Sequence, residues 1–200
     1  MRRETRRILL AAAKAEFAER GYGAATVARI AERADVAIQT LYSAWGSKQA
    51  LLRAIMETSV TGDDQTTGLS PDGVVGPKMA NLPAGIDTRQ RLTYLAHEFR
   101  LLAERSAIAW QTYRDAAAVD PKAAQDWQQF MAIRRRTCDQ IVASVPKEDL
   151  RPGLTAEMAA DTVWVIASPD TQGQLIRGLG YTYDQLEDWI GTILIAALLR

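Results

Sequence analysis

Cysteine and histidine are almost missing from this chain of 200 residues. Cys138 is its single cysteine, so no disulfide can close within the chain, and His97 is its single histidine. Zinc sites and cysteine–histidine nucleophiles need several such side chains. We also find no paired carboxylates and no serine–histidine–aspartate set. We therefore expect no catalytic residue, no metal and no cofactor.

Long apolar runs are missing as well. A membrane-spanning helix needs about 20 consecutive apolar residues, and no stretch of this sequence approaches that length. The first residues, MRRETRR, pass directly into an amphipathic pattern without the apolar core of a signal peptide. The sequence therefore predicts a cytoplasmic protein that has no membrane partner.

A net charge is also missing, because 24 basic side chains balance 24 acidic ones. The balance is uneven along the chain. Residues 1–60 carry ten lysines and arginines against six acids, and the remaining 140 residues carry 14 against 18. A basic segment joined to an acidic one is typical of a DNA-binding domain attached to a body that does not touch DNA.

The pattern that does run through the sequence is helical periodicity, and strand-like alternation persists nowhere. Near the N-terminus the apolar positions predict helices over 4–20, 26–33 and 37–43, followed by a fourth helix after Ser47. Gly21 stands where glycine commonly ends a helix. This spacing predicts a compact helical domain at the N-terminus.

Three parts of the chain differ in composition. We expect a DNA-binding domain over 1–60, which includes the start of a connecting helix, and a helical domain over 88–200. Between them, residues 61–87 hold eight glycines and prolines and are expected to form a flexible linker or lid. The last domain is predicted to contain two helices between Thr88 and Val119, one from Pro121, one over 155–168, a segment over 169–180 that is irregular or only partly helical, and a final helix over 183–199.

Two short helices joined by a tight turn can place the second helix in the major groove of DNA, where each base pair presents a distinct donor and acceptor pattern. Residues 21–48 fit this use. A wider pattern at fixed spacing comprises Ile8-Leu9, Ala12-Ala13, Phe17, Gly21-Tyr22, Thr26-Val27, Ile30-Ala31, Ala34, Val36, Thr40-Leu41-Tyr42, Ser47-Lys48 and Leu51-Leu52. With this pattern, about a quarter of the chain resembles the TetR family of transcriptional regulators. The resemblance implies an all-α fold, with an N-terminal three-helix helix-turn-helix DNA-binding domain followed by a larger helical ligand-binding and dimerisation domain.

The resemblance also implies individual roles in DNA binding. Thr26 is expected to cap the second helix and touch a phosphate, and Lys48 to attract a phosphate at the start of the fourth helix. Gln39 is expected to read a base edge such as that of adenine, while Thr40 and Tyr42 hold phosphates through their hydroxyls. The remaining residues of the predicted DNA-binding surface are Ala37, Ile38 and Ser43.

Three positions depart from the family's pattern. Asp35 stands where the turn usually has glycine, and Ala37 stands where a serine or threonine usually caps the next helix. After Tyr42 the family usually has phenylalanine or histidine-phenylalanine, whereas this chain has Trp45 alone after Ala44. Aspartate tolerates the left-handed conformation better than most residues, so we expect the turn to form. The departures affect DNA affinity and base preference. Tyr42 and Trp45 could instead pack the small core, and Lys48 could be an ordinary solvated side chain.

The helical body supplies aromatic side chains that can line an effector cavity, although each of them could equally fill the core. Arg134 lies on an otherwise apolar face, and we expect its guanidinium to reach outward. The alternative is an interior cation paired with an acid or an anionic ligand. His97 and Cys138 are further polar candidates. The predicted pocket comprises Phe99, Trp110, Tyr113, Trp127, Met131, Arg134 and Trp164.

The apolar stripe of the last helix, together with the helix over 156–168, could form half of a four-helix interface between two copies. The alternative is that the same stripe closes the core of one chain. Two-fold symmetry would place two recognition helices about 34–36 Å apart, which predicts a palindromic operator. The predicted interface comprises Val163, Trp189, Ile190, Ile193, Leu194 and Ala197.

These observations predict a homodimeric, TetR-like transcriptional regulator that binds double-stranded DNA. The favoured form is a repressor that an unknown small-molecule effector releases from its operator. One alternative is a DNA-binding protein whose helical body binds a protein partner. A second alternative is an enzyme that uses the cavity of the helical body.

Overall fold

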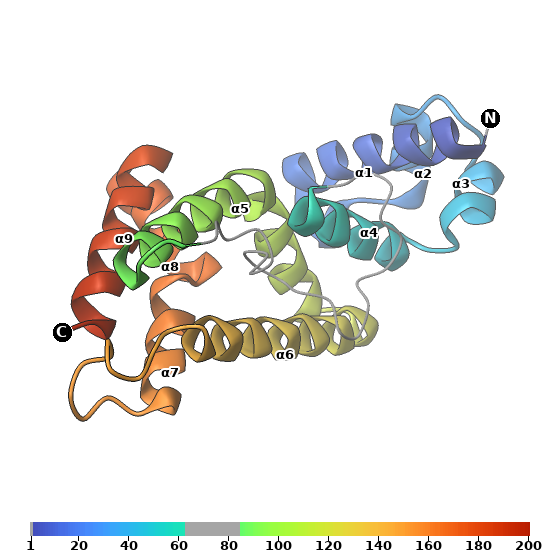
Figure 1. The fold of residues 1–200 in the computed structure, drawn as a ribbon. Coiled ribbons are helices and arrows are strands. Elements are labelled where there is room, and N and C mark those ends of the chain that lie inside the picture. Colours follow the sequence, from blue (N-terminus) through green and yellow to red (C-terminus); the bar gives the residue numbers. More distant parts are fainter. Residues whose placement is uncertain (1, 63–84) are drawn as a thin grey trace. The chain divides into compact units, whose positions relative to one another are not determined.

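The computed structural model describes residues 2–62 and 85–200, and its regular secondary structure is helical (Figure 1). The described residues contain no β-strand, apart from one isolated bridge between Leu150 and Leu199. The predicted all-α fold class is thus confirmed. Most of the predicted linker or lid over 61–87 lies outside the described residues. In chain order the elements are α1 (Arg2–Ala24), α2 (Val27–Arg33), α3 (Ile38–Trp45), α4 (Lys48–Thr61), α5 (Thr88–Ala117), α6 (Pro121–Ala143), α7 (Ala156–Ile166), α8 (Pro169–Gly173), the π-helix η2 (Gln174–Gly178) and α9 (Tyr183–Leu198).

The chain divides into two compact units. The described residues of the first unit lie within Met1–Ser70 and Ile108–Phe130, and those of the second lie within Pro71–Ala107 and Met131–Arg200. Helices α5 and α6 therefore each contribute a segment to both units. The unit that contains the N-terminal helices takes up residues that the sequence analysis placed in the domain over 88–200.

The N-terminal helices begin and end at the expected residues. Thr26 caps α2 by accepting a hydrogen bond from the backbone N–H of Arg29 at 3.2 Å, and Ser47 caps α4 in the same way. Gly21 kinks the end of α1 with a φ of 71°, a value that glycine adopts without strain. Ala37 precedes α3 and offers no side-chain cap, as the sequence predicted.

The core of the first unit is built from the faces that the periodicity selected. Leu9 and Ala13 of α1, Ile30 of α2, Leu41 of α3 and Leu51 of α4 are fully buried. Helix α1 packs against α2, α3 and α4. Burial of several branched side chains at about 1.5–3 kcal/mol each holds three short helices that would not be stable alone.

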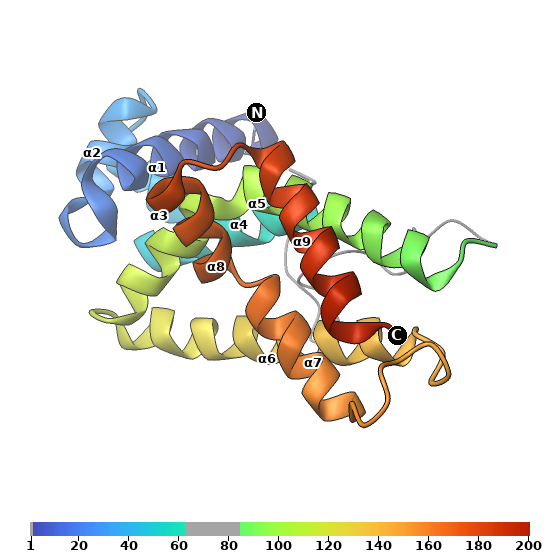
Figure 2. The same cartoon turned by 90° about the vertical axis from the view of Figure 1, so that its left-hand side faces the viewer.

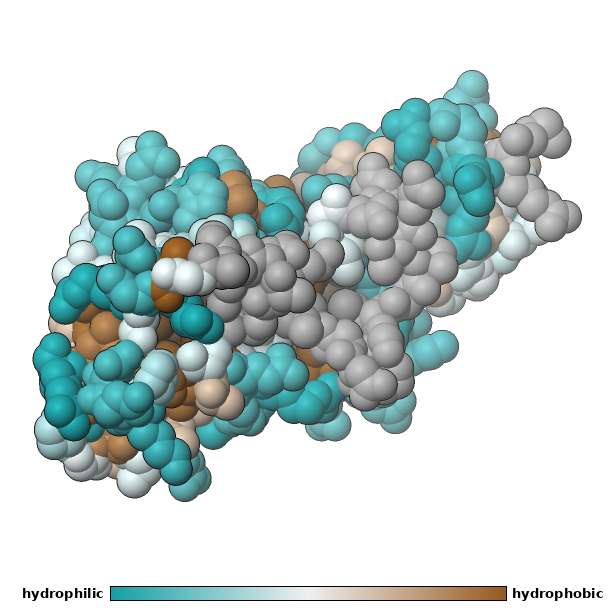
Figure 3. Space-filling model, viewed as in Figure 1, coloured by the Kyte–Doolittle hydropathy of each residue, from teal (hydrophilic) through white to brown (hydrophobic). Residues whose placement is uncertain are grey.

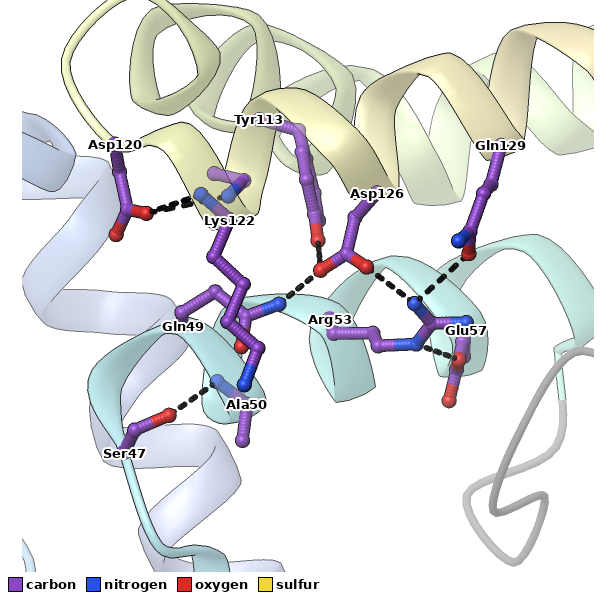
Figure 4. A network of polar contacts seen from close by, with 11 residues as sticks. Ser47, Gln49, Ala50, Arg53, Glu57, Tyr113, Asp120, Lys122, Asp126 and Gln129 are labelled. Atoms are coloured by element: carbon purple, nitrogen blue, oxygen red, sulfur yellow. Dashed lines mark hydrogen bonds and ion pairs between the residues drawn. The ribbon is translucent and has the colours of Figure 1, made fainter.

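The carboxylate of Asp126 joins α4 to the segments of α5 and α6 in this unit (Figure 4). Asp126 is 6% exposed and accepts hydrogen bonds from the Tyr113 hydroxyl at 2.8 Å, from Gln49 Nε2, and from Arg53 Nη1 at 2.5 Å. Arg53 also pairs with Glu57 one turn further along α4 at 2.9 Å. These bonds explain why residues 108–130 fold with the N-terminal helices.

Aromatic rings surround this carboxylate. The Tyr113 ring meets Phe130 edge to face with centroids 5.1 Å apart, and it stacks near Trp127 at 6.5 Å. Trp127 in turn meets Trp110 edge to face at 5.5 Å. The rings keep water from the Asp126 hydrogen bonds, and burial together with the hydrogen bond to Asp126 raises the pKa of Tyr113 above its usual range.

A second polar contact joins α1 to the loop before α6. The buried Tyr22 donates its hydroxyl proton to Asp120 Oδ2 at 2.6 Å. The other oxygen of Asp120 accepts from the backbone N–H groups of Lys122 and Ala123 at the start of α6. Chiefly because of the Tyr22 hydrogen bond, the pKa of Asp120 is lowered.

The second unit is held together by one hydrophobic cluster. Fully buried side chains include Leu92 and Leu95 of α5, Ile141 of α6, Val163 of α7 and Ile190 of α9. Helix α7 packs against α9 (Figure 2). Among residues 2–62 and 85–200, no helix combines the length and the apolar composition that crossing a membrane requires.

One expectation for the second half of the chain is wrong, because the two helices predicted between Thr88 and Val119 are one continuous helix, α5. Residues 169–180, which were expected to be irregular or only partly helical, contain α8 and η2. Ser168 caps α8 through the N–H of Thr171, and Pro169 suits its first turn, whereas glycines at 173 and 178 obscured the helical pattern.

The network around Asp126 predicts a large loss of stability when its acceptor is removed. Asp126→Ala leaves Tyr113, Gln49 and Arg53 without their buried partner, so we expect the free energy of unfolding to fall by about 3 kcal/mol. Urea denaturation measures this. As a control, Asp115→Ala removes an exposed carboxylate of α5 and should change stability by no more than about 0.5 kcal/mol. Equal unfolding midpoints for the two variants would contradict the assignment.

The Tyr22 contact predicts a pH-dependent contribution. Because the hydrogen bond lowers the pKa of Asp120 in the folded chain, its stabilisation is present at neutral pH and is lost as the pH falls through about 4 and below. Tyr22→Phe should therefore lower the free energy of unfolding at pH 7 by about 1 kcal/mol, since Asp120 is partly exposed. In urea titrations the gap from wild type should narrow in acid. A gap that is constant with pH would show that Asp120 is not the partner that matters.

Candidate nucleic-acid interface

The turn between α2 and α3 sets the direction of the second helix. Asp35 adopts a φ of 51°, and its N–H bonds to the carbonyl of Glu32 at 3.0 Å, while the N–H of Val36 bonds to the carbonyl of Ala31. The left-handed conformation expected at Asp35 is therefore present. It strains the backbone by about 1 kcal/mol relative to glycine, and it allows α3 to pack against α1 and α2 (Figure 1).

Helix α3 divides sharply into a buried and an exposed side. Leu41 is fully buried, whereas Ile38 is 42% and Tyr42 is 52% exposed. Gln39 and Ser43 are exposed beside them. A second helix of a helix-turn-helix pair that keeps such a face free has the arrangement needed to enter a major groove.

The other predicted DNA-binding residues differ in their exposure. Thr26 is exposed at the start of α2, and Ala37 is exposed just before α3. Thr40 is half-buried, so its hydroxyl is less open than the prediction requires. The DNA contacts of the individual residues stay predictions.

Lys48 has a role inside the domain that the sequence analysis did not foresee. Its ammonium donates to the backbone carbonyls of Tyr22 at 2.8 Å and Ala25 at 3.0 Å, and it lies 4.1 Å from the centre of the Tyr22 ring. Burial lowers the pKa of this lysine. The ammonium thus ties the start of α4 to the end of α1, and its predicted phosphate contact stays a prediction.

Contacts between Arg6 and Trp45 join the C-terminal end of α3 to α1. The Arg6 guanidinium lies 3.9 Å above the Trp45 ring and donates to the carbonyl of Ala44 at 2.6 Å. Trp45 is half-buried beneath it. Trp45 therefore packs within the domain, in agreement with the simpler of the two interpretations.

Arg29, to which the sequence analysis gave no role, differs from several neighbouring cations in its surroundings. Arg33 pairs with Glu19 at 2.5 Å, and Arg7 pairs with Glu4, so these charges are neutralised locally. Arg29, on the first turn of α2, is exposed and has no acidic partner among the described residues. The excess of basic residues over 1–60 is the signal that could have indicated it.

The seven predicted pocket residues fall into different units. Trp110, Tyr113 and Trp127 belong to the aromatic cluster of the first unit, whereas Phe99, Met131, Arg134 and Trp164 belong to the second. The second unit also has an open groove of about 640 Å³ between α5 and α9, and none of the seven residues lines it. The effector pocket remains a prediction.

The expectation that Arg134 reaches outward is wrong. Arg134 is 6% exposed, its guanidinium lies 3.9 Å from the Trp164 ring, and its Nη2 donates to the carbonyl of Trp164 in the last turn of α7. Helix C-termini attract cations, which explains why this charge is held inside. His97 bonds to Glu187 at 3.0 Å, and Cys138 is buried in the core with its pKa raised by burial.

The six residues of the predicted dimer interface differ in how deeply they are buried in the single chain. Val163, Ile190 and Leu194 are fully buried in the single chain and close its own core. Trp189 and Ile193 are only partly buried, as is Ala197. These three side chains are the members of the predicted set that a second copy could still contact.

Comparison with known proteins supports the assignment of the N-terminal helices. Residues 9–55 match the family described as bacterial regulatory proteins, tetR family. The match includes α2, α3 and the turn between them. An uncharacterized HTH-type transcriptional regulator of Bacillus subtilis strain 168, YdeS, is 25% identical over 186 residues, which cover 92% of this chain and 82% of YdeS.

Solved structures share the fold over nearly the whole chain. NalD of Pseudomonas aeruginosa, the secondary repressor of the MexAB-OprM multidrug efflux pump, superposes with a TM-score of 0.72 at 19% identity and covers 100% of this chain and 98% of its own. FadR of Bacillus subtilis, in complex with stearoyl-CoA, gives a TM-score of 0.69 at 18% identity, covering 94% and 97%. A TetR-like regulator from Rhodococcus sp. RHA1 gives 0.65 at 19% identity, covering 95% and 93%. The exposed helix-turn-helix and the match of residues 9–55 together indicate that the N-terminal helices form a DNA-binding domain of the tetR type, and the whole chain is similar to an HTH-type transcriptional regulator.

Proposed function

We propose that two copies of this chain bind a palindromic operator in double-stranded DNA and repress transcription until a small-molecule effector releases them. The observation that carries the proposal is the exposed face of α3, with its first-turn residues free and Leu41 buried behind it. Arg29 and the hydroxyl of Tyr42 supply phosphate contacts on either side. A regulator of this kind acts on cytoplasmic DNA and needs no catalytic activity.

Pairing of two chains is supported by the outer face of α7 and α9. Met158 is 54% and Val165 is 60% exposed, and they lie two turns apart on α7. Trp189 and Ile193 are half-buried on the neighbouring α9. Apolar side chains also reach the surface of the second unit near the end of α9 (Figure 3). Covering this face in a symmetric dimer would set two recognition helices about one turn of DNA apart.

Release from DNA by a small molecule is proposed because structurally similar proteins include a ligand-bound regulator and a repressor. FadR of Bacillus subtilis is solved with stearoyl-CoA, and NalD is named a repressor. An effector that binds one arrangement of the helical body more tightly than the other would shift the population away from the DNA-binding form. The same fold could instead take a protein partner, and a thermal-shift screen of metabolites without any stabilising compound would favour that alternative.

The proposal predicts that two recognition-helix variants fail in different ways. On duplexes selected by the full chain from random DNA, Tyr42→Ala should weaken binding to every sequence by a similar factor, because a phosphate contact carries no sequence information. It should leave the salt dependence unchanged, because the hydroxyl neutralises no phosphate charge. Gln39→Ala should instead lower the discrimination at one base pair of each half-site by about 1–3 kcal/mol. Fluorescence anisotropy at several salt concentrations measures both effects.

Gln125→Ala is the matched control, since it removes the same amide from an exposed position on α6. This variant should bind as wild type does. If no sequence is enriched from the library, or if all three variants bind the selected DNA as wild type does, the proposed docking of α3 is wrong.

A further inference from the structure

Helix α3 lacks the side chains that most often read guanine and cytosine. Its sequence, Ile38–Trp45, contains no lysine, arginine, aspartate or glutamate. Guanine is most often read by arginine or lysine, and cytosine donates to aspartate or glutamate. An uncharged helix in the major groove must therefore discriminate bases through amides, hydroxyls and apolar contacts.

Two cations next to α3 in the structure already have partners within the domain. The Lys48 ammonium is held by the carbonyls of Tyr22 and Ala25. The Arg6 guanidinium is stacked on Trp45 and bonded to Ala44. Neither cation is free to replace a missing arginine on the groove-facing side of α3.

Two adjacent side chains at the start of α3 are left to carry base preference. Ile38 is 42% exposed although it is large and apolar, and Gln39 beside it is exposed as well. Single exposed apolar residues are common on protein surfaces. Ile38, however, occupies the first turn of the helix, whose residues contact base edges in helix-turn-helix proteins. The hydroxyls of Thr40 and Ser43 pair with either kind of base and add little preference.

The chemistry of the major groove matches this pair. Thymine carries the C5-methyl group that apolar side chains contact in the groove, and adenine offers N6 and N7 to the two hydrogen bonds of a glutamine amide. Both matches select the same kind of base pair. We propose that Ile38 contacts a thymine methyl and that Ile38 and Gln39 together restrict the base pairs beneath the first turn of α3 to A·T. The inference rests on the proposed function, because it requires α3 to enter the major groove.

Deoxyuridine tests the contact, because it pairs like thymine and lacks only the methyl group. In duplexes selected by the full-length chain, each thymine is replaced singly by deoxyuridine and affinity is measured by fluorescence anisotropy. One replacement in a half-site should weaken wild-type binding about three- to fivefold, the effect of exposing one buried methyl group. That thymine should lie in or next to the base pair whose preference depends on Gln39.

The variant Ile38→Ala should bind the thymine and deoxyuridine duplexes equally at that position, and Ile38→Val should retain part of the difference. Circular dichroism should confirm an unchanged fold, since Leu41 on the other side of α3 makes the core contact. Ile8→Ala is the matched control, because Ile8 is 38% exposed on α1 of the same unit. It should keep the full wild-type difference.

Two results would overturn the inference while leaving the proposed function intact. One is a selected operator in which Ile38→Ala discriminates thymine from deoxyuridine as wild type does. The other is a G·C pair at the position that Gln39 controls. A library from which no sequence is enriched would instead refute the proposed function itself.

Discussion

The buried carboxylate of Asp126 is the interaction on which the arrangement of the first unit depends. It accepts hydrogen bonds from one side chain of α5 and two side chains of α4. A buried charge is stable only where it is paired and hydrogen-bonded, so α4 has little freedom to slide along the segments of α5 and α6 that carry the network. Only Gly46 and Ser47 separate the end of α3 from the start of α4. The position of the recognition helix therefore follows from a network that lies outside the helix-turn-helix itself.

The N-terminal helices use most of their positive charge internally. Lys48 closes the end of α1, Arg6 fastens α3, and Arg33 is neutralised by Glu19. Arg29 is exposed and has no acidic partner among the described residues. In the proposed function, affinity and base preference fall to different side chains, because phosphate contacts set affinity and register while the uncharged α3 reads base edges. The proposal thereby accounts for a DNA-binding surface on a chain of zero net charge.

Local signals in the sequence predicted the local structure well. Thr26 caps α2 as expected, Ser47 and Thr155 cap the helices that follow them, and Asp35 takes the left-handed conformation expected of it. A cap needs only the side chain and an N–H three residues later, so a short window of sequence contains the whole interaction. The family resemblance further predicted which residues of α3 belong to its exposed face.

Long-range contacts could not be read in the same way. The bond from Gln49 to Asp126 spans 77 residues, and that from Tyr22 to Asp120 spans 98. Periodicity marks a buried face and does not say which side chain it will meet. For the same reason Arg134 was expected to reach outward, since its partner is a backbone carbonyl of another helix. Nor did the sequence show that the aromatic residues of the predicted pocket belong to two different units, because their contacts lie far along the chain.

The central claim is that a dimer of this regulator sets two copies of α3 into the major groove of one operator. Hydroxyl-radical footprinting of the full-length chain on its selected duplex tests that claim most directly. The account predicts two protected segments related by two-fold symmetry, with centres about 34–36 Å apart along one face of the DNA. A single protected segment, or protection without a fixed spacing, would contradict it.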